Sequence, residues 1–237
     1  MLVAAAVCPC PPLLIPDVAA GAAPELDAAR TACTDALGVL AASRPDLLIV
    51  IGPADLAGRG PYPEGATGTF EEFGVDLGVR LGRDLGAVSD RPLPASLAVG
   101  AWLLARTGWG DAPVEALGVG EPLETGRCTD TGRALAARAD RVALLVMGDG
   151  SACRTLKAPG YLDERAAGFD AAASHALGTA DITGLIALDE ALAYELKAAG
   201  RAPWQVLAGA GQDAGLDGRL LYDEAPYGVG YMVAAWS

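Results

Sequence analysis

The sequence predicts a single three-layer α/β domain over residues 1–237, with helices on both faces of a mixed, mostly parallel sheet. Short apolar runs alternate with longer segments of helical periodicity, which is typical of strand–helix–strand units. The apolar runs stop abruptly in loops rich in glycine and proline, as strands buried on both faces of a parallel sheet do. No repeat, linker or low-complexity tract interrupts the alternation, so we expect one domain, although the length alone also permits two.

The strand predictions follow the short apolar runs in chain order. We expect strands at residues 2–7, 46–51, 114–119, 142–147, 204–208, 219–222 and 228–236. The first run is too short for a membrane span, no Lys or Arg precedes it, and prolines follow directly. It therefore fits a buried strand better than an export signal or a membrane anchor.

The helix predictions follow apolar residues at helical spacing, such as Leu26 and Leu37. We expect helices at residues 22–42, 94–107, 126–139, 163–177 and 182–199. Gly200 is a natural end for the last of these. Residues 56–75 are rich in Gly and Pro, which predicts a long loop that covers the site. Residues 77–85 fit either a strand or a short helix.

The amino-acid composition limits the kinds of partner that the protein can bind. The formal net charge is −13, with only two lysines among 17 basic residues, which argues against nucleic acid and anionic membranes as partners. The same charge can simply keep an alanine-rich chain soluble. Five cysteines, an odd number without disulfide-scaffold spacing, indicate a reducing compartment, so we expect a cytoplasmic protein. Cys33, within a helical apolar pattern, fits a small core residue.

Polar side chains follow two of the predicted strands. The strand at residues 142–147 ends in a loop that offers Asp149, Ser151 and Cys153, and the strand at residues 46–51 is followed by Asp55. Ligands of open α/β sheets bind at the carboxyl edge of the strands. We therefore take Asp149 and Ser151 as candidate catalytic residues and Asp55 as a candidate ligand-binding residue.

General motif searches exclude several sites. The chain has no P-loop, and the glycines from Gly209 to Gly215 miss the dinucleotide-binding spacing by one residue. Cys8 and Cys10 form neither a redox pair nor half of a four-thiolate zinc site. His175 is the only histidine and lies in a predicted helix, and no nucleophile-elbow sequence supports a serine triad built on it.

Five segments in a fixed order resemble the class III extradiol ring-cleavage dioxygenases, a superfamily that includes the Memo-type proteins. They read CPCPPLLIPD, LLIVIGPAD, LPASLAVGAWLL, VMGDGSACRTLKAPGYLDERAAGFD and LLYDEAPYGVGYMVAAW, and together they extend over most of the chain. Similar chains are common in actinobacteria. The resemblance is to the catalytic chain of these oxidoreductases. It implies an enzyme that holds Fe(II) with two histidines and a glutamate, binds a catechol, activates O2 and uses a further histidine for acid–base catalysis.

The chain departs from the family pattern at each of these four positions. Cys10 stands where the family's first metal histidine lies in H-P-P, and Ala54 stands at the second. The acid–base histidine of G-D-x-S-H matches Ala152, and the glutamate of G-E-C-G matches Arg201. A thiol, a methyl group and a guanidinium cannot hold Fe(II) as two imidazoles and a carboxylate do. We therefore expect no family-type cofactor.

Three hypotheses follow. In the first, the chain is a non-catalytic binding or assembly protein that pairs with itself or with a related subunit. In the second, Cys10, Cys153 and Asp55 form a different site for Fe(II), zinc or copper, although each cysteine also fits a small buried residue. In the third, a metal-free enzyme uses Asp149 or Asp55 as a base, and Arg201 holds a small aromatic or anionic ligand.

Overall fold

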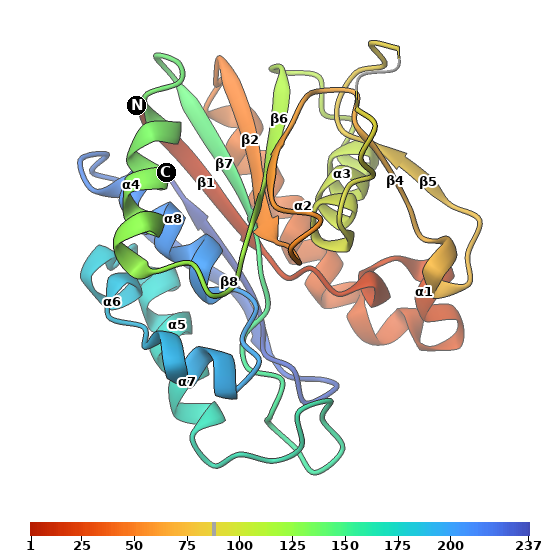
Figure 1. Ribbon diagram of the computed structural model, residues 1–237, viewed down its shortest axis with the longest axis vertical. Coiled ribbons are helices and arrows are strands. Elements are labelled where there is room, and N and C mark those ends of the chain that lie inside the picture. The colour runs from red at the N-terminus through yellow and green to blue at the C-terminus, as the bar shows by residue number, and fades with distance from the viewer. Residues whose placement is uncertain (87–88) are drawn as a thin grey trace.

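The computed structural model, which describes residues 1–86 and 89–237, is a three-layer α/β domain (Figure 1). Its central sheet has the strand order β3-β6-β2-β7-β1-β9-β8. The strands are β1 (Leu2–Cys8), β2 (Leu47–Pro53), β3 (Gly60–Tyr62), β6 (Val114–Val119), β7 (Val142–Met147), β8 (Gly218–Glu224) and β9 (Tyr231–Trp236). The strands β6, β2, β7 and β1 are parallel to one another. The edge strand β3 is antiparallel to β6, and β9 is antiparallel to both β1 and β8.

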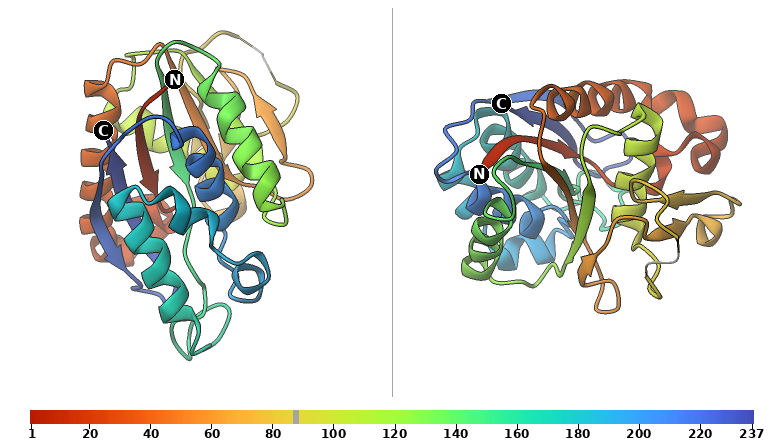
Figure 2. Two further views of the ribbon diagram at one scale, coloured as in Figure 1. Left: turned by 90° about the vertical axis from the view of Figure 1, so that its left-hand side faces the viewer. Right: turned by 90° about the horizontal axis from the view of Figure 1, so that it is seen from above.

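Helices cover both faces of the sheet (Figure 2). One face carries α2 (Asp27–Ala42) and α3 (Ala95–Thr107), and short α1 (Pro16–Ala19) lies near them. The opposite face carries α4 (Thr125–Ala136), α5 (Ala166–Thr179), α6 (Ile182–Ile186), α7 (Glu190–Glu195) and α8 (Arg201–Gly211). A second small sheet pairs β4 (Thr67–Thr69) with β5 (Gly78–Arg80) beside α3.

Strand β7 shows why the core has two halves. Its side chains alternate between the faces, so Leu145 joins the cluster under α2 and α3, while Leu144 and Val146 join the cluster under α8. Every residue of β7 is buried, because both faces are covered by helices. Burial on both faces therefore explains the unbroken apolar run from which this strand was predicted.

Helices α4 and α8 touch backbone to backbone. A Cβ atom added at Gly132 of α4 would overlap the carbonyl oxygen of Val206, and one added at Gly209 of α8 would overlap Thr129. Only glycine permits this approach at the two positions. The contact holds the loop before α4 close to the start of α8.

The prediction of a strand at residues 204–208 is wrong, because these residues belong to α8. All residues of α8 are buried, and residues 204–208 form a short, mostly apolar run like that of a buried strand. Gly200 also precedes α8 and is its N-cap rather than the end of an earlier helix.

The prediction of one helix at residues 182–199 is wrong as well, because the segment forms α6 and α7. Asp181 caps the first helix through the amide of Gly184 at 3.0 Å, and Asp189 caps the second through the amide of Leu192 at 2.7 Å. Each aspartate satisfies a free helical amide and so starts a new helix.

The remaining predictions agree with the structure to within a few residues, with three refinements. The predicted loop at residues 56–75 contains β3 and β4, and the ambiguous segment at residues 77–85 contains a strand, β5. Helix α2 starts at Asp27, after a 3-10 segment, rather than at residue 22. Among the described residues, none of the helices combines the length and apolarity that crossing a membrane requires.

Candidate functional site

The carboxyl ends of the parallel strands meet in the lower half of Figure 1, and a cleft lies at this edge. Two adjoining cavities, of about 750 and 690 Å³, share Pro53, the last residue of strand β2, and Ala54 and Asp55, which follow it. The first cavity also includes Glu121 from the loop after β6, and the second also includes Cys10 from the loop after β1. We call the two cavities together the carboxyl-edge cleft.

The cleft has charges of both signs, and Arg91, one of its three cations, is engaged by the protein itself. Arg91, in the second cavity, donates to the carbonyl oxygens of Arg59 at 2.9 Å and Pro61 at 3.0 Å. Its guanidinium also lies 4.5 Å from the centre of the Tyr62 ring. Arg91 therefore holds the loop before β3 in place, and backbone carbonyl oxygens partly offset its positive charge.

Four carboxylates of the cleft, Asp55, Glu72, Asp90 and Glu121, have no ion-pair partner among residues 1–86 and 89–237. Asp55 is exposed and accepts a hydrogen bond from the amide of Gly58 at 2.9 Å. Burial raises the pKa of Glu121, and the charge of Arg201 only partly opposes this shift. The second cavity contains three of these four carboxylates, so added negative charge is unfavourable there.

Cys10 and Asp149 form a pair at the edge of the second cavity. The amide of Cys10 donates to Oδ1 of Asp149 at 2.8 Å, and the Cys10 thiol lies 3.8 Å from Oδ2. Burial raises the pKa of Asp149 to about 6, although both hydrogen bonds from Cys10 favour the charged form. Asp149 can therefore gain or lose a proton close to neutral pH.

The thiol of Cys10 is held in its neutral form, whereas a reactive cysteine needs the thiolate form. Burial raises its pKa well above the ordinary value, and the neighbouring charge of Asp149 raises it further. A thiolate is the nucleophile and the metal ligand in proteins, so a thiol held neutral serves as a weak hydrogen-bond donor instead. In this pair Cys10 orients the carboxylate.

Ser151, a predicted catalytic residue, is fully buried and is absent from the lining of the cleft. Its amide and its hydroxyl donate to Oδ1 and Oδ2 of Asp170, at 2.7 and 2.8 Å. Arg154 pairs with the same carboxylate at 3.0 Å. The geometry gives Ser151 a structural role, since its hydroxyl fixes the loop after β7 to helix α5.

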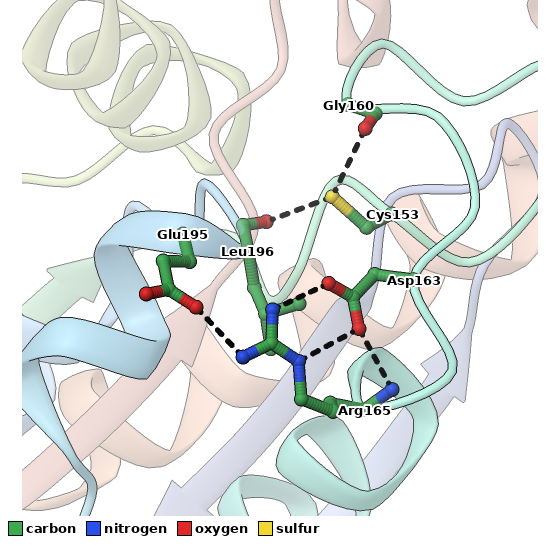
Figure 3. A network of polar contacts seen from close by, with 6 residues as sticks. All are labelled: Cys153, Gly160, Asp163, Arg165, Glu195 and Leu196. Carbon is green, nitrogen blue, oxygen red and sulfur yellow. Dashed lines mark hydrogen bonds and ion pairs between the residues drawn. The ribbon is translucent and has the colours of Figure 1, made fainter.

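Cys153 lies in a separate polar network (Figure 3). Its sulfur lies 3.5 Å from the carbonyl oxygens of both Gly160 and Leu196, and burial raises its pKa. Nearby, Arg165 bridges Asp163 and Glu195. Both contacts of the thiol are to backbone, so Cys153 fastens its own loop to the segment after α7.

The structure does not assemble the predicted ligand set of Cys10, Cys153 and Asp55. Cys10 packs in the core half under α2 and α3, whereas Cys153 packs in the half under α8. In the part of the chain that the structure describes, no three His, Cys, Asp or Glu residues form a group that could hold a metal ion. The sequence could not show this, because loops on one sheet edge can still turn to opposite faces.

Arg201, predicted to hold an anionic ligand, is only 1% exposed. Its guanidinium donates to the carbonyl oxygens of Leu123 and Glu121 and to the side chain of Gln205. These contacts tie the loop before α4 to the first turn of α8. Arg201 is absent from the lining of the cleft, so it stabilises the wall without presenting its charge to a ligand.

Several lining residues were missed by the sequence analysis. Glu121 could have been found, since it follows the strand at residues 114–119 as Asp55 follows its own strand. Tyr194 and Lys197 gave no such signal, because the segment around them was predicted as part of a continuous helix. His175 lies on α5 with its side chain exposed, outside the lining of the cleft.

The residues at the family's four functional positions do not fit the implied Fe(II) site. Cys10 and Ala54 do come together, because both line the second cavity. Ala152 is buried and Arg201 is bound to backbone carbonyls, so neither joins them. The set contains no imidazole and no carboxylate, which are the donors that the family's iron requires.

Comparisons with known proteins bear on the fold alone. No family model and no curated protein matches the chain. A crystal structure described as the uncharacterized protein JW3007 from Escherichia coli K12 is similar, with a TM-score of 0.55 and 15% sequence identity. The similarity covers 99% of each chain, so the whole domain, including the sheet edge that bears the cleft, belongs to one shared fold.

Proposed function

We propose that the protein is a divergent relative of the extradiol dioxygenases that binds a small organic molecule in the carboxyl-edge cleft without the family's Fe(II) site. One observation carries this proposal. Cys10 and Ala54, which stand at the positions of the family's two metal histidines, line the same cavity. This supports the cavity as the counterpart of the family's site, whereas a thiol and a methyl group do not replace the two imidazoles that the family's iron requires.

The size and lining of the cleft suggest the chemistry of the ligand. Each cavity lies within the range of about 300–1,000 Å³ that small-molecule sites occupy. Pro53, Ala54 and Pro94 provide apolar surface, while Asp55 and Glu121 provide carboxylates without ion-pair partners in the described part of the chain. The second cavity, with three carboxylates and a single cation in its lining, favours a neutral or cationic molecule with an aromatic or aliphatic body over an anionic one.

The test is a binding screen of aromatic amines, phenols and aromatic acids followed by NMR. Ala54 is half-buried between the two cavities, so Ala54→Trp places a large side chain in both. Ala172→Trp, on the exposed side of α5, is the matched control for the added indole. We expect amines and phenols to bind the wild type and the control, and Ala54→Trp to weaken binding at least tenfold. Equal binding by all three proteins would reject the cleft as the site.

The loss of the iron site has its own test. Elemental analysis of protein purified without a metal-affinity tag, under reducing and oxygen-poor conditions, measures bound metal directly. We expect well under one equivalent of iron, zinc or copper. Near-stoichiometric metal that survives dialysis would overturn this part of the proposal, and oxygen uptake with catechols would then be measured.

A second candidate function, metal-free acid–base catalysis, is favoured by the Cys10–Asp149 pair. Asp149 is partly exposed, lies beside the second cavity and titrates close to neutral pH. General acid–base catalysis works best with a group of this kind. Recovery of a bound ligand unchanged after long incubation supports the binding function, whereas a product formed by the wild type and lost in Asp149→Asn supports catalysis.

A further inference from the structure

A third cavity lies outside the carboxyl-edge cleft, between the loop that follows β7 and the turn that joins β8 to β9. These two segments lie side by side at the bottom of Figure 1, and the amide of Arg154 donates to the carbonyl oxygen of Gly228 at 3.0 Å. The cavity has a volume of about 690 Å³. Its lining includes Arg154, Leu156, Lys157, Leu162 and Tyr227.

The charge of this cavity differs from that of the rest of the protein. Its lining contains two cationic side chains and no carboxylate, whereas both cavities of the cleft contain several carboxylates. The chain as a whole carries a net charge of −13 and has only two lysines, one of which is Lys157. A cationic lining in so acidic a protein creates a local preference for anions.

The cationic groups remain available to a ligand. Lys157 is exposed, and its amine has no hydrogen bond or ion pair within the described ranges. Arg154 uses one terminal nitrogen on Asp170, whose oxygens also accept the two hydrogen bonds from Ser151. Since Arg154 and Asp170 largely balance each other, Lys157 contributes the uncompensated positive charge.

Apolar side chains stand beside these cations on a rigid loop. Leu156 and Leu162 are 63% and 45% exposed, so both offer apolar surface to a ligand. The loop is held by main-chain hydrogen bonds, from Gly160 to Ala152 at 2.8 Å and from Asp163 to Cys153 at 3.0 Å. A surface that is already ordered loses little conformational entropy when a ligand binds.

We infer that this cavity is a second binding site, for a small monocarboxylate with an apolar tail. The amine of Lys157 binds the carboxylate with support from Arg154, and Leu156 and Leu162 contact the tail. The assignment rests on a different cavity and different residues from the proposed function, so either can fail without the other.

Isothermal titration with hexanoate tests the inference in a matched pair of variants. Lys157→Gln removes the proposed partner of the carboxylate, and Lys197→Gln removes the only other lysine, which lines the cleft. Both variants change the net charge by the same amount. We expect Lys157→Gln to weaken hexanoate binding at least tenfold and Lys197→Gln to leave it within twofold of the wild type.

Two further probes separate the parts of the interaction. Acetate lacks the tail and should bind at least tenfold more weakly than hexanoate, while hexylamine should show no binding that depends on Lys157. The inference is overturned if wild-type protein does not bind hexanoate, if both lysine variants lose binding equally, or if hexylamine binds as hexanoate does. Unchanged melting temperatures show that the variants are folded, as expected for exposed side chains.

Discussion

Replacing Asp149 by Asn tests the central electrostatic feature of the cleft. Burial raises the pKa of this carboxyl from an ordinary 3.8 to about 6. Each pKa unit corresponds to about 1.4 kcal/mol, so ionised Asp149 destabilises the folded protein by about 3 kcal/mol at high pH. The side chain of Asn keeps an oxygen that can accept the hydrogen bond from Cys10 but cannot ionise.

The sign of the pH dependence follows from which state binds the proton more tightly. The folded protein has the higher pKa, so between about pH 4 and pH 6 it holds more protons than the unfolded chain. The contribution of Asp149 to stability therefore falls as the pH rises through this window. The penalty is about 1.6 kcal/mol at pH 5 and about 3 kcal/mol at pH 7.5.

The assay is urea unfolding of the wild type and Asp149→Asn, followed by circular dichroism between pH 5 and pH 7.5. This range stays above the isoelectric point of about 4.4. Relative to the variant, the wild type should lose about 1.4 kcal/mol of unfolding free energy across it. Other titrating groups are present in both proteins and cancel in the difference.

Asp163→Asn is the matched control, because Arg165 lowers the pKa of Asp163 to about 2. Its ion pair contributes stability that is lost only as the pH falls below about 4, so the difference from wild type should be constant between pH 5 and pH 7.5. A constant difference for Asp149→Asn as well, or a wild type that gains stability with rising pH relative to that variant, would refute the reasoning.

Three other substitutions are predicted from packing, and a fourth from the Cys10–Asp149 pair. Gly132→Ala should destabilise the protein by about 1–3 kcal/mol in urea unfolding, because its Cβ would overlap the backbone of α8. Gly38→Ala, at an exposed position of α2 with no atom within 4 Å of the added carbon, should instead stabilise it by up to about 1 kcal/mol. Cys153→Ala should fold with a loss of about 1 kcal/mol and leave the pKa of Asp149 unchanged. Cys10→Ala should also fold, but it should raise that pKa above about 6 in an NMR titration, since a hydrogen-bond donor is lost.

The fold was predicted from sequence where burial leaves a simple pattern. Strands β6 and β7 were located to the residue, and β7 shows the cause, because a strand covered on both faces needs an unbroken apolar run with definite ends. Burial also explains the wrong prediction for α8. Its residues are buried on every side, and residues 204–208 form a short, mostly apolar run that resembles a buried strand.

The candidate site was predicted only in part, because the position of a residue's backbone and the direction of its side chain have different causes. The end of a strand fixes where the backbone of Asp55, Asp149 and Ser151 lies, and the strand-end rule placed all three near the sheet edge. The direction of a side chain depends on partners far along the chain. Asp149 meets Cys10, which is 139 residues away, whereas Ser151 turns to Asp170 on α5.

The partners of each side chain also decide which residues of the site should be mutated first. A polar side chain whose hydrogen-bonding atoms are all used by the protein can bind a ligand only by giving up those bonds, at a cost of about 1–3 kcal/mol for each buried group. The hydroxyl of Ser151 is used in this way, because it donates to Asp170. The terminal nitrogens of Arg201 are used as well, because they donate to backbone carbonyl oxygens. Asp55 keeps an exposed carboxylate in both cavities, and Asp149 remains partly exposed with a labile proton. Mutation of the proposed site should therefore begin with the two aspartates rather than with the serine or the arginine.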